Sequence, residues 1–329
     1  MKLVPCPQGL ALARYEIRFR AGVDGVLLPP YKGSTFRGGF AGTFRHLVCA
    51  RDARECKECS LKHNCPYPLV FESEPPPGSE ALRSFDAIPR PFVLEPPPDR
   101  TTFYNPGETF DFALILFGKA RNLLPYFVVT LEEFSRRGIG KERRPFSLEE
   151  IAAINPLTGV SAIVYHGEDR VVRPRDLSLS AGDIWNRAAG YPVENLRKIE
   201  AAFHTPTRIT HEDTSIRSPE FHAVVRNLLR RISSLCYFHH GFAYEADFLG
   251  IIRRAGEVRL VRDDTSWVTI GRYSSRQARR VPLEGFVGRA VYEGPLGDFL
   301  PLLLLGELIH VGKGTVFGQG RFELRIFVD

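Results

Sequence analysis

The alternation of apolar and polar residues predicts a regular order of strands and helices in the first half of the chain. The stretch ALARYEIRFRA (11–21) has the period of two that places one side of a strand against a core. Residues 34–50, STFRGGFAGTFRHLVCA, are mostly small and apolar and indicate a short helix. Proline-rich loops follow, and then a strand at 108–118, a helix at 119–137, the turn RGIGK and a strand beginning FSLEEI.

The second half repeats this order. LRKIEAAFHTPTRIT is strand-like, and residues 218–236 have the spacing of an amphipathic helix with a strand, a helix and the strand RFELRI after it. Two β-α-β-β-α-β units in tandem give this pattern. The sequence therefore predicts an α+β fold of two ferredoxin-like (RRM-like) domains, 1–195 with a cysteine-rich insertion and 196–329. The apolar positions predicted to face the core from the helix at 218–236 are Val224, Val225, Leu228, Leu229, Ile232 and Leu235.

A glycine-rich loop lies near the C-terminus, where four of the nine residues from Gly312 to Gly320 are glycine. Such loops let a backbone approach a ligand and point N–H groups at it, and the usual ligand is a phosphate. This loop follows a helical pattern and precedes a strand, which is the reverse of the order in mononucleotide and dinucleotide motifs. The backbone of a polymer is therefore the predicted ligand of Gly312, Lys313, Gly314, Gly318 and Gly320.

Composition and charge favour nucleic acid as that polymer. The chain of 329 residues has a net charge of +6, and only eight of its 44 basic residues are lysine. The planar guanidinium of arginine binds phosphate in a forked geometry and stacks on bases. A GC-rich genome would, however, produce the same excess of arginine over lysine. Residues 253–280 hold eight arginines against three acids. The sequence shows no apolar run of eighteen residues and no secretory signal, which predicts a cytoplasmic protein without membrane association.

Four cysteines cluster within seventeen residues, with six, two and five residues between neighbours. Four thiols with a central C-x-x-C can surround one tetrahedral Zn²⁺ and fill its coordination shell, so the predicted metal is structural. Four reduced, unbound thiols are the alternative. The predicted ligands are Cys49, Cys56, Cys59 and Cys65, whereas Cys6 and Cys236 are interpreted as ordinary buried thiols.

Five motifs in order give the chain a specific resemblance. LLLLGELIHVGKGTVFGQGRFEL, FHTPTRI, FHAVVRNLLRRISSL and RYSSRQ, with FRGGFAGTFRHLV in the first half, resemble the RAMP superfamily of CRISPR-associated proteins. Within it the chain is similar to the repeat-processing endoribonucleases, the sixth of the numbered Cas proteins. The resemblance implies binding of CRISPR repeat RNA and cleavage of precursor CRISPR RNA (crRNA) without a catalytic metal. Attack by the RNA's 2′-hydroxyl would leave a 2′,3′-cyclic phosphate and a 5′-hydroxyl.

The resemblance also implies catalytic residues. His46 lies on the small-residue helix that carries the catalytic histidine in similar proteins, and Tyr31 lies in the loop before it. Histidine is the residue type that exchanges protons near neutral pH. A packed or solvent-facing histidine, and a tyrosine that covers apolar surface, are the structural alternatives. Lys32 and Lys57 are nearby cations without a clear match, and His310 is interpreted as a helix-end residue.

The arginine-rich segment is the predicted path of the RNA, because arginine and tyrosine contact phosphates and stack on unpaired bases. A solvated basic face is the alternative. A non-catalytic RAMP subunit that holds guide RNA in an interference complex would need the same surface but neither His46 nor Tyr31, and other Cas proteins would be its partners. The predicted RNA-binding residues in this segment are Arg272, Tyr273, Arg276, Gln277, Arg279 and Arg280.

Overall fold

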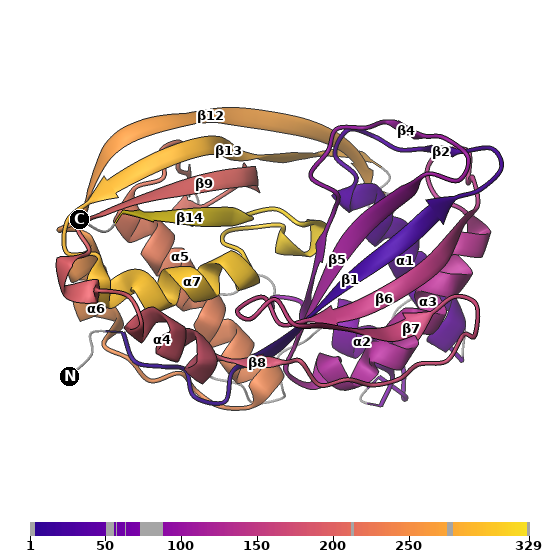
Figure 1. The fold of residues 1–329 in the computed structure, drawn as a ribbon, viewed down its shortest axis with the longest axis horizontal. Coiled ribbons are helices and arrows are strands. Elements are labelled where there is room, and N and C mark those ends of the chain that lie inside the picture. The colour runs from indigo at the N-terminus through magenta and orange to yellow at the C-terminus, as the bar shows by residue number, and fades with distance from the viewer. Residues whose placement is uncertain are drawn as a thin grey trace. The chain divides into compact units, whose positions relative to one another are not determined.

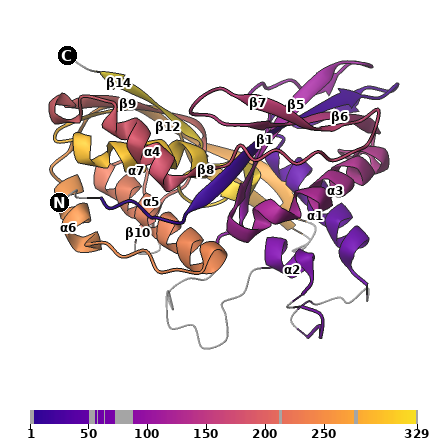
Figure 2. The ribbon, with the colours of Figure 1, turned by 60° about the horizontal axis from the view of Figure 1, so that its bottom comes forward.

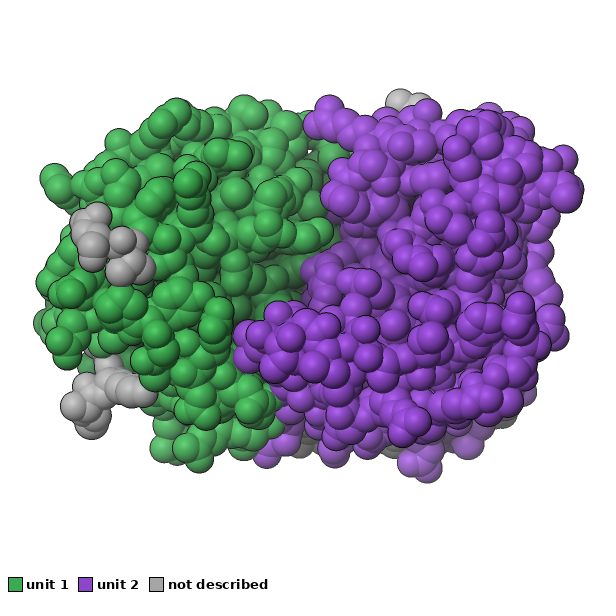
Figure 3. All heavy atoms as spheres, viewed as in Figure 1, with its two compact units in different colours: residues 1–10, 180–237, 242–329 green, residues 11–179, 238–241 purple. Residues whose placement is uncertain are grey.

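The computed structural model divides the chain into two compact units, which Figure 3 shows in different colours. Unit 2 contains Ala11–Leu179 and Phe238–Gly241, and unit 1 contains the rest of the chain. The structure describes residues 4–50, 56, 58–62, 64–72, 88–211, 214–274 and 279–327.

Unit 2 begins with the strand predicted at 11–21 and with the predicted helix, which spans Gly33–Val48 rather than 34–50. Its sheet lies against two long helices, α1 and α3 (Figure 1). Shorter strands and a 3-10 turn lie in the connections between these elements. The elements are β1 (Ala11–Ala21), β2 (Val26–Leu27), α1 (Gly33–Val48), α2 (Pro66–Phe71), β3 (Phe92–Glu95), β4 (Phe103–Tyr104), β5 (Thr109–Phe117), η1 (Gly118–Leu123), α3 (Leu124–Arg137), β6 (Phe146–Ile154), β7 (Ser161–His166) and β8 (Leu179–Ser180).

The sheet of unit 2 has ferredoxin-like topology. Its strand order is β3-β5-β1-β6-β7, with β1 antiparallel to both β5 and β6. Since α1 follows β1 and α3 follows β5, the chain order is β-α-β-β-α-β with β7 added at one edge. Figure 2 shows α1 and α3 on the same side of this sheet. The predicted fold of the first domain is therefore confirmed.

Aromatic packing explains why α1 sits where it does. Phe36, Phe40 and Phe44 recur every fourth residue and form one buried stripe. The Phe36 ring lies 3.7 Å from that of Phe112 on β5 and 5.2 Å from that of Phe134 on α3, measured between ring centroids. A Cβ at Gly39 would collide with the Phe134 ring, so this glycine permits the close approach of α1 and α3.

Unit 1 repeats the topology of unit 2. Its main sheet has the order β12-β13-β9-β14, with β13 and β14 antiparallel to β9, and α5 and α7 lie on one side of it (Figure 1). All six apolar positions predicted for the helix at 218–236 are buried. The elements are α4 (Ala181–Ala189), η2 (Val193–Asn195), β9 (Lys198–Thr207), β10 (Thr210–His211), β11 (Thr214–Ser215), α5 (Phe221–Leu235), α6 (Phe248–Ala255), β12 (Arg259–Ser274), β13 (Arg279–Glu293), η4 (Gly297–Phe299), α7 (Leu300–Ile309), η5 (Thr315–Phe317) and β14 (Phe322–Phe327). A further short helix, η3 (Cys236–His240), begins in unit 1 and ends in unit 2.

The break between the units lies earlier than the sequence predicted. Helix α4 packs against α7, and the Trp185 indole N–H donates a hydrogen bond to the carbonyl of Val4 at 3.3 Å. Both contacts tie α4 to the second ferredoxin-like fold. The break therefore falls between Leu179 and Ser180 rather than at residue 195, and the N-terminal residues up to Leu10 belong to unit 1.

The faces of both sheets that are turned away from the helices carry paired charges. On β1, Arg14 bonds Glu95 at 2.7 Å and Arg18 bonds Asp111 at 3.1 Å. On β9, the outward positions are Lys198, Glu200, Ala202 and His204, none of them an aromatic residue on which a base could stack. Part of the arginine excess is therefore neutralised by acids, and the β9 face lacks the stacking surface of RNA-binding RRM sheets. Within the described ranges, no helix is long and apolar enough to span a membrane.

A buried carboxyl links α7 to β14 and predicts a pH dependence. Burial raises the pKa of Glu307 to about 7, while its Oε1 accepts a hydrogen bond from the Leu324 N–H at 2.6 Å. Because the folded pKa exceeds the unfolded value, this group's contribution is fully present below the unfolded pKa and is lost as pH rises through 7. Glu307→Gln keeps the acceptor, so we expect it to stabilise the protein at pH 8 by about 3 kcal/mol and not at pH 4.

Thermal unfolding of the parent and of Glu307→Gln at both pH values measures this effect. The matched control is Glu293→Gln, since Glu293 is only partly buried and is paired with Lys198 on the sheet surface. An equal shift in melting temperature at pH 4 and pH 8 would show that Glu307 titrates normally.

Candidate functional site

His46 lies near the C-terminal end of α1 and its side chain is exposed. It follows the buried Phe44 by two residues, which turns it about 200° away from the buried stripe of the helix. Arg45, its neighbour, lies with its guanidinium 5.5 Å from the centre of the Tyr67 ring. The helix therefore presents the imidazole to solvent, where a substrate can reach it.

Tyr31 lies at the opposite end of the same helix. It precedes Gly33, the first residue of α1, whereas His46 is two residues before the last. With a rise of 1.5 Å per residue, the two side chains are separated by roughly 20 Å of helix. Burial raises the pKa of the Tyr31 phenol far above its ordinary value, so this group stays protonated. The structure therefore places Tyr31 and His46 at opposite ends of α1.

A buried charged network beside Tyr31 was not predicted. The Lys32 side chain is fully buried, and its Nζ donates to the Asp99 carbonyl at 2.8 Å and to Asp99 Oδ1 at 3.1 Å. The Tyr104 hydroxyl donates to the same carboxylate at 3.0 Å. Lys32 therefore anchors the start of α1 and is not available to a phosphate. Lys57, the other lysine considered, lies outside the described residues.

The glycine-rich loop is a tightly hydrogen-bonded turn between α7 and β14. Gly312, Gly314, Gly318 and Gly320 all have φ between 75° and 85°, the left-handed region that favours glycine. A Cβ at Gly312 would collide with the carbonyl of Arg208, and one at Gly320 with that of Val311. These positions therefore require glycine for the fold of the turn, whatever the turn binds.

Part of the loop's hydrogen-bonding capacity is used within the chain. The N–H groups of Lys313, Phe317, Gly318 and Gly320 donate to backbone carbonyls at 2.8 to 3.1 Å. The Lys313 side chain is exposed at the surface of the loop. This lysine is therefore the member of the predicted set best placed to meet a phosphate.

His310 has the structural role that the sequence predicted. It is fully buried at the end of α7, with φ of 63°, and its Nδ1 lies 2.9 Å from the carbonyl of Gln319. A carbonyl only accepts, so Nδ1 carries the proton. Arg231 on α5 donates from Nε to the carbonyl of Ile309 at 2.6 Å. Burial lowers the pKa of Arg231 to about 9, which still leaves it charged at neutral pH. The two residues hold the base of the glycine-rich loop.

His239 and His240 both make hydrogen bonds to backbone groups far away in the sequence. His239 is buried, and its Nε2 donates to the carbonyl of Pro89 at 2.6 Å. His240 Nε2 lies 3.0 Å from the backbone N and O of Ala11. Both belong to unit 2, and both tie a segment distant in sequence to that unit.

The arginine-rich segment forms a long antiparallel hairpin of β12 and β13. The two strands pair from Arg259↔Glu293 to Ser274↔Arg279, whereas β9 pairs with β13 only from Phe286 onward. The distal part is therefore a two-stranded ribbon. Arg276 and Gln277 lie outside the described residues, and the other predicted residues, Arg272, Tyr273, Arg279 and Arg280, are placed in the strands by their backbones alone.

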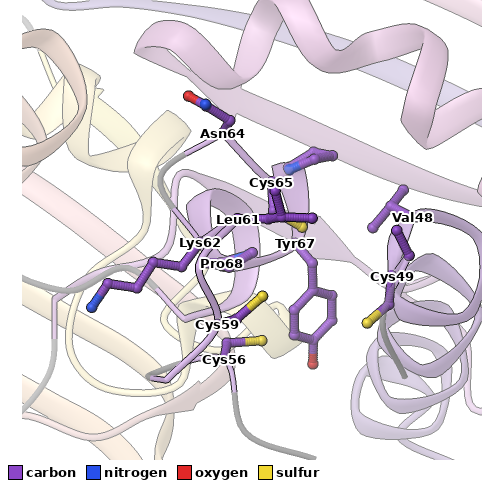
Figure 4. Close-up of a pocket in the computed structure, with 12 residues that line it drawn as sticks. Val48, Cys49, Cys56, Cys59, Leu61, Lys62, Asn64, Cys65, Tyr67 and Pro68 are labelled. Carbon is purple, nitrogen blue, oxygen red and sulfur yellow. The ribbon is translucent and has the colours of Figure 1, made fainter. Parts of the chain in front are cut away.

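The four clustered cysteines line one cavity of about 210 Å³ in unit 2 (Figure 4). Cys49 ends α1 and Cys65 precedes α2, with Cys56 and Cys59 on the turn between them. Among the described residues, no three His, Cys, Asp or Glu side chains are gathered closely enough to hold a metal ion. The cavity unites the predicted ligands, but their sulfur atoms are not in a coordination shell.

Comparison with known proteins divides the chain in the same way as the fold. Residues 10–177 match the AF_1859_N family, an N-terminal domain, and residues 202–322 match the CRISPR-associated endoribonuclease Cas6 family. An uncharacterized protein from Archaeoglobus fulgidus is 27% identical over 306 residues, covering 91% of this chain and 93% of its own.

Solved structures share the fold over nearly the whole chain. The Cas6 of Thermus thermophilus is 14% identical and has a TM-score of 0.54, covering 96% of this chain and 99% of its own. A chain of a partial Cas6-RT-Cas1–Cas2 complex is 12% identical with a TM-score of 0.56, covering 98% of this chain. This chain spans only 47% of that longer protein. At these identities the likeness concerns the fold alone.

Proposed function

The chain belongs to the Cas6 family of CRISPR-associated RAMP proteins, and we propose that it is an endoribonuclease that binds CRISPR repeat RNA and cleaves precursor crRNA. The match of residues 202–322 to the Cas6 endoribonuclease family carries this proposal. A repeat RNA is the partner, and other Cas proteins are partners of the complex in which the processed RNA is used.

The reaction in this proposal is an attack of the RNA's own 2′-hydroxyl on the adjacent phosphate. A base removes the 2′ proton and an acid protonates the departing 5′-oxygen, which leaves a 2′,3′-cyclic phosphate and a 5′-hydroxyl. His46 is the group assigned to proton transfer, because it is exposed on α1 and can reach a bound strand. Lys313 is assigned to a phosphate of the same RNA, since its side chain is exposed on the glycine-rich loop.

The separation of Tyr31 and His46 favours a second candidate function. If His46 has no second proton-transferring residue beside it, the chain could hold repeat RNA without cutting it, as a structural RAMP subunit. In that case the exposed Lys313 and the hairpin ribbon would still be needed, whereas His46 would be dispensable.

Incubation of the purified protein with end-labelled repeat RNA separates the two functions. We expect one cut per repeat, at an undiminished rate when EDTA is added to the assay to remove free divalent ions. The 5′ fragment should end in a cyclic phosphate, which mass spectrometry detects, and the 3′ fragment should accept a 5′ phosphate from polynucleotide kinase without prior dephosphorylation. RNA that is bound tightly but never cut, with or without Mg²⁺, would establish the non-catalytic role.

A further inference from the structure

The cavity at the end of α1 is lined by four cysteines. None of its lining residues was assigned a role in the proposed RNA processing. All four come from residues 49–65, and all four line the same cavity (Figure 4). The remaining two cysteines, Cys6 and Cys236, belong to the other compact unit. The fold has therefore gathered every cysteine of one segment around one space.

The backbone of the central C-x-x-C is already turned toward that space. The Cys59 N–H donates to the carbonyl of Cys56 at 3.1 Å, and the Lys62 N–H donates to that of Cys59 at 3.1 Å. In Figure 4 the Cys56 and Cys59 side chains leave this turn in the same direction, toward Tyr67. Two thiols presented from one tight turn are half of a tetrahedral sulfur site.

The walls of the cavity do not suit water as its occupant. Val48, Leu61 and the proline rings on either side of Tyr67 supply apolar surface between the thiols. A buried water needs several strong polar partners, and thiols are weak ones. A thiophilic cation would instead be satisfied by four sulfur ligands at about 2.3 Å.

We propose that Cys49, Cys56, Cys59 and Cys65 bind one structural Zn²⁺. The ion would draw the four sulfurs from the cavity walls into one shell, so metal binding is coupled to local folding. No coordination position remains for water, which excludes a hydrolytic role for this ion. The site takes one Zn²⁺ and releases the thiol protons to solvent as the ligands become thiolates.

Zinc bound here would brace the helix that carries His46. Cys49 follows His46 by three residues and is the C-cap of α1, while Cys65 is the N-cap of α2. The two helices already meet through the Phe44 and Phe71 rings, whose centroids are 5.3 Å apart. The metal adds a covalent link between them at the end nearest the imidazole. Only this consequence for His46 rests on the proposed function; the zinc site itself does not.

Metal content of the full-length protein, purified under reducing conditions without a chelator, tests the proposal. We expect about one zinc per chain by elemental analysis in the parent and in the control Cys6→Ser, and none in Cys56→Ser/Cys59→Ser. Co²⁺ added to chelator-stripped parent should give the visible absorption of tetrahedral sulfur coordination. Zn²⁺ added back should raise the melting temperature of the stripped parent and leave that of the double variant unchanged.

Three results would overturn the site. They are a parent that contains no zinc and takes up none after reduction, a double variant with undiminished zinc, and a Cys56–Cys59 disulfide found in place of metal. The measurements on the parent stand even if the double variant fails to fold. They are also independent of RNA cleavage, so a protein that binds zinc and cuts nothing would refute the proposed function while leaving the zinc site intact.

Discussion

Cleavage of repeat RNA by His46→Ala is expected to be about 10²- to 10⁴-fold slower than by the parent, with binding of the RNA nearly unchanged. The imidazole is exposed on α1 and lies off the buried stripe, so its removal should not disturb the packing of Phe36, Phe40 and Phe44. An interaction made only in the transition state lowers the rate constant without weakening the ground-state complex. Single-turnover cleavage and filter binding with the same labelled RNA measure the two quantities separately.

His222→Ala is the matched control, because His222 also lies on a helix, α5, and has no role in the proposed reaction. Tyr31→Phe is the informative companion variant. If Tyr31 contributes only to packing at the start of α1, Tyr31→Phe should cut at the parent rate. Cleavage by His46→Ala at the parent rate would remove this histidine from the mechanism.

The ferredoxin-like folds could be predicted because each central strand has one buried face. β1 spans Ala11–Ala21 as its alternation indicated, and the apolar stripe of α5 is buried at every predicted position. Strand β12 was not predicted, since both of its faces carry polar residues and it pairs only along one edge. The arginines of this segment were evident in the sequence, but the strand that carries them was not. Alternation reports burial, and a two-stranded ribbon buries too little to leave that pattern.

The candidate site was harder to predict for two reasons. Its geometry depends on the length of one helix and on contacts between residues that are far apart in the sequence. The sequence places Tyr31 and His46 near the same predicted helix, but only the length of α1 shows that they lie at its two ends. Lys32 contacts Asp99, a residue 67 positions away, and no local pattern signals that pair. The glycine loop was located correctly, yet its glycines meet the needs of a left-handed turn as well as those of a ligand.

Gly314→Val is expected to unfold the glycine-rich loop rather than to block a bound RNA selectively. Gly314 has φ of 78°, and a Cβ there would collide with the Gln319 side chain, which is itself buried. Forcing a β-branched residue into the left-handed region costs about 1 to 3 kcal/mol before any clash is counted. Loss of RNA affinity in this variant should therefore accompany a lower melting temperature, and it cannot by itself assign the loop to RNA binding.

Lys313→Ala separates the two effects, because its side chain is exposed and the backbone N–H that bonds Arg208 remains. We expect an unchanged melting temperature, weaker binding to all repeat variants alike, and a slope of log K against log salt that is smaller by about 0.7 to 0.9. Lys198→Ala is the control, since Lys198 is similarly exposed in unit 1 but paired with Glu293 at 3.1 Å. If Lys313→Ala and Lys198→Ala have the same salt slope as the parent, the loop does not contact phosphate, and its glycines are explained by the turn alone.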